Sequence, residues 1–169
     1  MSPSARRPGN PLMLRLRLLI SLCAFALMLA LPALAKAAIR KQQSQVAEGV
    51  KIARYARKFV GIRYSYGGTS PRTGFDCSGF VRFVYAHFGL SLPHYTVSQF
   101  RLGRRVSRAA LHPGDLVFFN GLSHVGLYIG RGLFVHAPHT GLRVQVESIN
   151  GWYAHEYAGA RRVVRSRWS

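Results

Sequence analysis

The chain has 169 residues, 49% of them hydrophobic and 12% aromatic, a composition that permits a packed core and excludes an intrinsically disordered chain. Its length predicts a single domain. The formal charge of +19 comes from 24 Lys and Arg residues against five acidic ones, and it favours polyanionic partners such as nucleic acid, anionic lipid or anionic wall polymer.

Residues 1–35 have the pattern of a secretory signal peptide. Four arginines precede an uncharged, mostly apolar run at 18–31. Pro32-Ala33-Leu34-Ala35 then offers a small-x-small cleavage site, with Ala35-Lys36-Ala37 as a second option. The alternative is an uncleaved anchor, because residues 18–35 give 18 uncharged positions, the lower edge of a spanning helix. We therefore expect an exported protein of the periplasm or cell envelope. Without the four arginines the formal charge is still +15, and export makes a nucleic-acid partner unexpected.

The next segments are expected to form a short tether, a helix and a loop. Residues 36–45 are polar and predict the tether. Residues 46–60 carry apolar side chains at three- and four-residue spacing, which predicts an amphipathic helix that stops at Gly61. Residues 65–74 contain three glycines and a proline, and they predict a loop.

The rest of the chain predicts helices followed by an antiparallel sheet. A second helix is expected from Cys77 to about Gly89, with Asp76 as its N-cap, and a shorter one within 93–102. Strands are expected at 116–119, 124–129, 133–135, 142–146 and 161–164, the second and third forming a hairpin. This order predicts an α+β fold for residues 46–169.

Cys77 is the only cysteine outside the expected signal peptide. A lone thiol in an exported protein has no disulfide partner inside the chain, so it is either inert and buried or chemically active. Its position at a helix start favours the thiolate, because helix N-termini are electropositive. Ser78 and Gly79 keep that first turn small, so a substrate can approach it.

Two histidines in the predicted hairpin are the candidate partners of this thiol. Residue 130 is midway between His124 and His136, so a turn centred there would place them nearly opposite each other on adjacent strands. His124 would then be the general base and His136 the group that orients it, with Cys77 as the nucleophile. His139 is the nearest competitor for the third role. One Cys and two His at long spacing do not match a zinc site, so neither a metal nor a cofactor is expected.

Five ordered segments resemble the NlpC family of papain-like cell-wall peptidases. They are residues 63–68, 75–81, 113–119, 123–130 and 135–137, and the resemblance runs from about residue 46 to 165. It implies a compact papain-like α+β domain that hydrolyses peptide bonds in the stem or crosslink of peptidoglycan through an acyl-enzyme. It also implies that Cys77, His124 and His136 are the catalytic residues.

The resemblance further implies roles for three residues in substrate binding. Tyr64 matches a tyrosine near the oxyanion, and Asp76 and Ser78 match positions that bind a free substrate amine in some relatives. For Asp76 the helix-cap interpretation is equally good. The chain departs from the family pattern at Tyr66, where relatives often have Trp, and at His94, where many have Arg; His94 is otherwise expected to be a surface or loop residue.

Three functions remain open at this stage. The leading hypothesis is a secreted cysteine peptidase acting on peptidoglycan stem peptides. A non-enzymatic envelope-binding protein would use only the basic surface, and an amidase or acyltransferase would use the same triad. Because no separate wall-binding module is expected, attachment to an anionic envelope polymer or lipid would fall to two basic clusters. They are Lys51, Arg54, Arg57 and Lys58, and Arg101, Arg104, Arg105 and Arg108.

Overall fold

The computed structural model describes residues 11–163, with side chains from residue 34 onward. The chain divides into two compact units, 1–43 and 44–169. Helix α1 (Pro11–Arg57) begins in the first unit, and its part from Ser44 onward belongs to the second. The expected tether at 36–45 is helical, and most of the expected signal peptide lies outside the side chains described. In the described part of the chain, no helix is long and apolar enough to cross a membrane.

The helices of the second unit begin and end close to where their sequence signals stand. Helix α1 ends three residues before the predicted 60, and a turn leads to Gly61, whose φ of 93° suits glycine. Helix α2 (Cys77–His87) starts after its cap Asp76 and is followed by Gly89 at φ 74°. The short helix α3 (Thr96–Phe100) lies inside the predicted range. Helix α4 (Trp152–His155) was not predicted.

Two antiparallel sheets make up the β part of the second unit. The small one pairs β1 (Thr69–Ser70) with β2 (Gly74–Phe75), in the segment predicted to be a loop. The large one has the strand order β3-β8-β4-β5-β6-β7. Its strands are β3 (Arg104–Val106), β4 (Leu116–Phe119), β5 (His124–Gly130), β6 (Leu133–His136), β7 (Gln145–Ser148) and β8 (Tyr157–Arg162).

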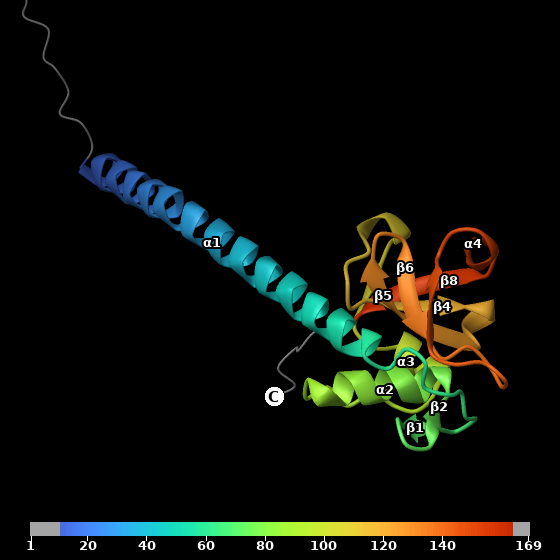
Figure 1. Ribbon diagram of the computed structural model, residues 1–169. Coiled ribbons are helices and arrows are strands. Elements are labelled where there is room, and N and C mark those ends of the chain that lie inside the picture. Colours follow the sequence, from blue (N-terminus) through green and yellow to red (C-terminus); the bar gives the residue numbers. More distant parts are fainter. Residues whose placement is uncertain (1–10, 164–169) are drawn as a thin grey trace, which may run out of the picture. The chain divides into compact units, whose positions relative to one another are not determined.

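The large sheet is covered on both faces by apolar side chains, with helices α2 and α3 on one side and α4 on the other (Figure 1). Strand β4 is fully buried because its alternate side chains point into the cores on the two faces of the sheet. Leu116 and Phe118 join a core with α1 and α2, whereas Val117 and Phe119 join a second core with Tyr153 of α4. The α+β expectation is therefore confirmed, with the helices packed on an antiparallel sheet.

Two predicted strands of the large sheet had wrong boundaries, and a third strand, β3, was not predicted. The strand expected at 142–146 forms at Gln145–Ser148, and the one expected at 161–164 begins earlier, at Tyr157. Strand β3 was missed because three residues, two of them Arg, carry too little apolar alternation to be recognised. It forms because β8 pairs with it, Arg105 opposite Arg161.

Candidate active site

Cys77 is the first residue of α2, and its neighbours are held by the cap residue Asp76. The carboxylate accepts hydrogen bonds from the amide of Gly79 at 2.7 Å, the amide of Gly67 at 2.9 Å and the hydroxyl of Ser78 at 3.2 Å. These bonds satisfy an otherwise free amide of the first helical turn. The loop before α2 and the turn that carries the thiol are thereby fixed to one carboxylate.

His94 is a fourth partner of this carboxylate, which the sequence did not indicate. Its Nε2 lies 2.9 Å from Oδ1 and 2.8 Å from Oδ2 of Asp76. His94 lies in the loop between α2 and α3, as expected, but its side chain is partly buried because this loop folds back onto the start of α2. Only the tertiary structure brings residues 18 positions apart together here.

Gly79 is small for a reason other than the one expected. A Cβ at Gly79 would lie 2.1 Å from the carbonyl oxygen of Gly68 and 3.0 Å from Nε2 of His94. Ser78 is also buried, and its carbonyl accepts a hydrogen bond from the side chain of Gln99 at 3.0 Å. This side of the turn packs against protein, so it is closed to a substrate.

The rings of His124 and His136 meet, although the two residues are not directly opposite each other. The β5–β6 register pairs Leu127 with Val135, and one more step along it sets His136 across from Gly126. His124 is therefore its diagonal neighbour on the same face. Nε2 of His124 lies 2.7 Å from Nδ1 of His136. The two histidines lie close together, as predicted, but diagonally rather than nearly opposite, because the turn shifts the register by two residues.

Gly126 makes this diagonal contact feasible. A Cβ at position 126 would lie 2.4 Å from Cδ2 of Phe134 and 3.2 Å from Cβ of His136. Phe134 packs against His136 with ring centroids 4.6 Å apart, and Tyr153 packs edge-to-face against it at 5.5 Å. The missing side chain thus leaves room for the aromatic rings that hold His136 in place.

Both histidines are buried and neutral at pH 7. Burial lowers the pKa of His124 to about 4, and the nearby His139 contributes to the shift. The pKa of His136 is lowered to about 3, mainly by burial and to a smaller extent by His124 and His139. The bond between Nε2 of His124 and Nδ1 of His136 can form with the hydrogen on either nitrogen. Only the arrangement with the hydrogen on Nε2 of His124 leaves Nδ1 of His124 free to accept a proton.

This proton arrangement leaves one buried donor without an acceptor. His136 must carry its own hydrogen on Nε2, and that atom has no hydrogen-bond partner among the described residues. His136 is completely buried. An unpaired buried N–H is costly, so the aromatic rings around His136 determine its orientation more than hydrogen bonds do.

The thiol faces the start of β5. The backbone amide of Val125, the residue after His124, donates a hydrogen bond to the sulfur of Cys77, as do the amides of Ser78 and Cys77 itself. Burial raises the pKa of the Cys77 thiol more than these amides lower it, and the charge of Asp76 raises it further. The amides at the helix start therefore act in the expected direction, toward the thiolate, but burial outweighs them.

Tyr64 and His139 are the remaining candidate residues near the thiol and the histidine pair. The pKa of Tyr64 is raised, mainly by burial and to a smaller extent by the charges of Cys77 and Asp76. Tyr64 therefore lies close enough to the thiol to interact with it electrostatically. His139 is exposed, and its Nδ1 lies 2.9 Å from the carbonyl oxygen of Thr140, so it does not bond to His124. Within the residues that the structure describes, no three His, Cys, Asp or Glu side chains are grouped to hold a metal ion.

Gln99 is a residue of this region that sequence reasoning missed. It is completely buried, and its Nε2 donates to the carbonyl oxygens of Ser78 at 3.0 Å and Pro93 at 2.8 Å. A buried glutamine in a short helix gives no recognisable sequence signal. Its effect is to join the segment before α3 to the first turn of α2.

Comparisons with known proteins identify several relatives of this chain. The chain is 40% identical over 129 residues to a protein of Haemophilus influenzae named probable endopeptidase NlpC homolog, covering 75% of this chain and 69% of that protein. It is also 40% identical over 115 residues to the murein DD-endopeptidase MepH of Escherichia coli, covering 62% of this chain and 42% of MepH.

Among solved structures, the NlpC/p60 domain of the peptidoglycan hydrolase SagA matches with a TM-score of 0.62 and 37% identity, over 67% of this chain and 97% of that domain. An NlpC/P60 family protein from Bacillus cereus matches with a TM-score of 0.63 and 38% identity, over 66% of this chain and 38% of that protein. The sequence profile of the NlpC/P60 family matches residues 61–162, more than half of the chain and all of the elements just described from β1 to β8. The chain belongs to the NlpC/P60 family.

Proposed function

We propose that this protein is a cysteine peptidase that hydrolyses peptide bonds in the stem or crosslink of peptidoglycan. The observation that carries the proposal is the neutral His124–His136 pair, with the backbone amide of Val125, the residue after His124, bonded to a thiol at a capped helix start. The names of the relatives support the substrate class, since MepH is a murein endopeptidase and SagA a peptidoglycan hydrolase.

In this mechanism Cys77 is the nucleophile and His124 the base. The thiol proton moves to Nδ1 of His124 as the sulfur attacks the substrate carbonyl, so the two neutral groups become charged together. The amides of Cys77 and Ser78 stand close enough to the sulfur to stabilise the oxyanion. The His124 imidazolium then protonates the leaving amine, which departs and leaves an acyl-enzyme. His124 next takes a proton from water, and the resulting attack releases the carboxylic acid and restores the thiol.

His136 orients the base throughout this cycle. It accepts the Nε2 hydrogen of His124 and so holds Nδ1 free for the sulfur. We assign Tyr64 and Asp76 to the wall of the substrate site. Ser78, for which the resemblance implies the same role, lies on the side of the first turn of α2 that packs against protein, and its hydroxyl donates to Asp76.

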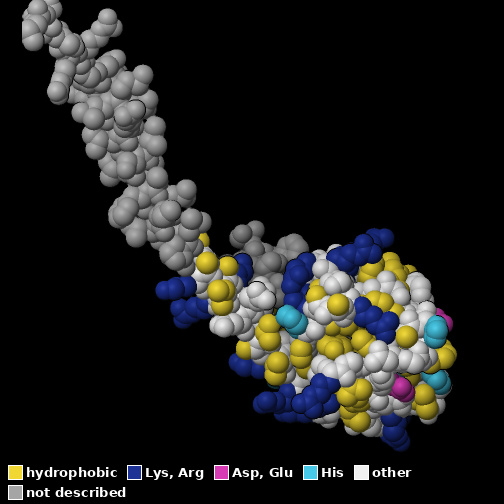
Figure 2. Space-filling view, turned by 90° about the horizontal axis from the view of Figure 1, so that it is seen from above, with side chains coloured by type: hydrophobic (Ala, Val, Ile, Leu, Met, Phe, Trp, Pro, Cys, Tyr) yellow, Lys and Arg dark blue, Asp and Glu magenta, His cyan; other side chains and the backbone are white. Residues whose placement is uncertain are grey.

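Such a substrate requires an extracytoplasmic location. We propose that residues 1–35 direct export to the periplasm or cell envelope and that the basic surface helps to attach the protein there. Figure 2 shows Lys and Arg side chains spread over the visible face of the second unit, with few acidic ones among them. Among the described residues, the ion pairs are His94–Asp76 and Arg162–Asp115, so most cations have no acidic partner.

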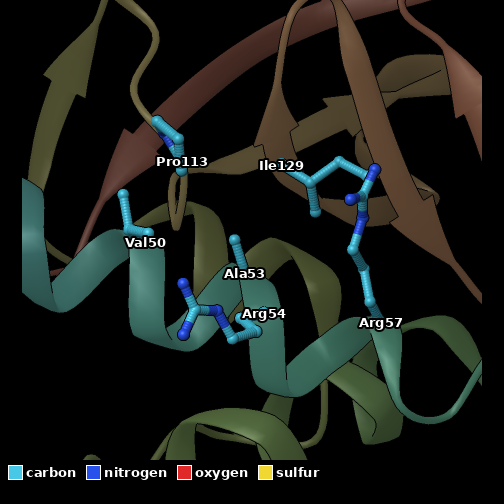
Figure 3. A pocket seen from close by; sticks show the side chains of 6 residues that line it. All are labelled: Val50, Ala53, Arg54, Arg57, Pro113 and Ile129. Carbon is cyan, nitrogen blue, oxygen red and sulfur yellow. The ribbon is translucent and has the colours of Figure 1, made fainter.

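The two basic clusters differ in how well they support attachment. Arg108 donates to the carbonyl oxygen of Ile149 at 2.7 Å and lies over the ring of Tyr157. Its guanidinium is therefore already engaged in contacts within the protein. Like Arg108, Arg54 and Arg57 are exposed, and they line an apolar pocket of about 170 Å³ (Figure 3). The cluster on α1 is therefore the better candidate for contact with an anionic polymer or lipid.

Digestion of purified peptidoglycan, with mass spectrometry of the products, tests the proposed function. A new amine and carboxylate within the peptide are expected, and the product masses identify the bond. Release of an intact stem from the glycan would instead indicate an amidase, and transfer to an added amine an acyltransferase. Binding to sacculi without any product would indicate the non-enzymatic alternative.

Co-sedimentation with sacculi tests the basic surface. Attachment should weaken as salt rises, because exposed charges are screened within about 8 Å at physiological ionic strength. Arg54→Glu with Arg57→Glu should weaken it, whereas Arg108→Gln is the matched control. Pelleting that depends on neither salt nor these residues would overturn the assignment.

A further inference from the structure

His94 forms a close pair with the carboxylate that caps the nucleophile's helix. Its Nε2 lies within 2.9 Å of both oxygens of Asp76, and the two side chains are only 25% and 13% exposed. An imidazolium in this position would form a partly desolvated ion pair, which is stronger than one on an open surface. Asp76 itself is adjacent to Cys77 in the chain.

The position of His94 is built into the fold. The buried side chain of Gln99 donates to the carbonyl oxygen of Pro93, the residue before His94, and to that of Ser78, the residue after Cys77. Gly79 also approaches the imidazole so closely that a Cβ there would lie 3.0 Å from Nε2. His94 is therefore held beside the first turn of α2 independently of its bond to Asp76.

The electrostatic connection to the thiol runs through Asp76. The negative charge of Asp76 raises the pKa of the Cys77 thiol, in addition to the larger effect of burial. A positive charge on His94, bonded to both oxygens of that carboxylate, would offset its field at the sulfur. A neutral His94 would leave the field in place.

We propose that His94 is a positioning residue for the nucleophile, which holds the Asp76 carboxylate and, when protonated, neutralises it and increases the thiolate fraction of Cys77. The importance of this role for hydrolysis rests on the proposed function, whereas its effect on the thiol does not. Only the protonated imidazole carries this charge, so the effect should weaken as pH rises.

Other titratable groups near the thiol do not produce the same pH dependence. Tyr64 faces Cys77 and Asp76, and burial raises its pKa, so it keeps its proton from pH 6 to 9. Burial lowers the pKa of His124 to about 4, so that ring stays neutral. His139 is exposed and acts on the two buried histidines. It is the matched control.

The test is the rate at which iodoacetamide alkylates Cys77 between pH 6 and 9. Mass spectrometry of the peptide that contains Cys77 reports this rate in the full chain, without interference from Cys23. His94→Ala should slow alkylation about three- to tenfold at pH 6, and the difference should disappear by pH 9. His94→Arg should match the wild type at pH 6 and exceed it at pH 9, because arginine keeps its charge. His139→Asn should leave the alkylation rate of Cys77 at its wild-type value at both pH 6 and pH 9.

A second variant keeps the test decisive if His94→Ala perturbs the fold. In an Asp76→Asn background, which retains a cap, the charge that His94 offsets is absent, so adding His94→Ala should no longer change the alkylation rate. A pH-independent ratio between His94→Ala and wild type, or no recovery with His94→Arg, would overturn the proposal. If the wild type fails to hydrolyse muropeptides, the proposed function fails, yet the alkylation rates still decide the role of His94.

Discussion

The start of α2 and the ends of β5 and β6 meet at the candidate active site, but different forces hold their side chains. Around Cys77 the contacts are polar, and Asp76 alone accepts hydrogen bonds from two amides, a hydroxyl and an imidazole. Around His136 the contacts are aromatic, and one ring nitrogen has no hydrogen-bond partner in the described part of the chain.

This difference separates two requirements of the chemistry. A nucleophile must point in a fixed direction, and directional hydrogen bonds provide that. A base must be unprotonated before it acts, and burial provides that by penalising the imidazolium. The nucleophile side should therefore respond to the loss of single polar groups, and the histidine side to acid and to changes in packing.

The largest expected effect is the loss of either catalytic partner. Cys77→Ala and His124→Ala should each reduce muropeptide hydrolysis about a thousandfold or more, and the double variant should be no worse, because the two act as one unit. The free energy of unfolding should fall by less than about 2 kcal/mol in Cys77→Ala. Single-variant and double-variant rates, with thermal melts, check this. Wild-type rates in Cys77→Ala would contradict the assignment.

A smaller loss is expected at His136, because it transfers no proton to the substrate. His136→Ala should lower kcat roughly 100-fold, while His136→Asn should recover part of it by keeping a polar partner for Nε2 of His124. The comparison of kcat in the two variants is the measurement. Equal rates in His136→Ala and wild type would show that packing alone orients His124.

Acid should destabilise the histidine side specifically. The unfolded chain binds protons on His124 and His136 near the ordinary pKa of about 6.5, whereas the folded chain does not until the pKa values of about 4 and about 3. The unfolded state thus holds more protons in that range, so stability should fall as pH drops from about 6.5 to about 4. Urea denaturation at several pH values checks this. His136→Asn should reduce the slope, and exposed His155→Asn should leave it unchanged.

The smallest effect on stability is expected at the helix cap. Asp76→Ala removes the acceptor for the Gly79 amide and should cost about 1 kcal/mol, while Asp76→Asn should cost less because it can still cap. Urea midpoints of the two variants make the comparison. An Asp76→Asn variant as unstable as Asp76→Ala would mean that the ion pair with His94, rather than the cap, carries the stabilisation.

The sequence predicted most of the helices and the central hairpin, because these have local signals. Asp76 and Gly89 mark α2, and the turn at 130–132 marks β5 and β6. It also selected His124 and His136, whose rings do meet. What it missed depends on long-range contact. The register that makes the two histidines diagonal is set by the turn and by Gly126, and His94 reaches Asp76 only after the chain has folded back.

The place of β8 in the large sheet has a consequence for how the protein acquires its structure during synthesis. The last of the described strands lies between β3 and β4 in the sheet, and Arg162 at its end forms the buried ion pair with Asp115 at 2.6 Å. Until residues 157–162 have been made, β3 has no partner strand and β4 keeps an open edge. A hydrolase built in this way completes its large sheet only after translation of β8, and truncation before Tyr157 would remove an interior strand rather than a dispensable tail.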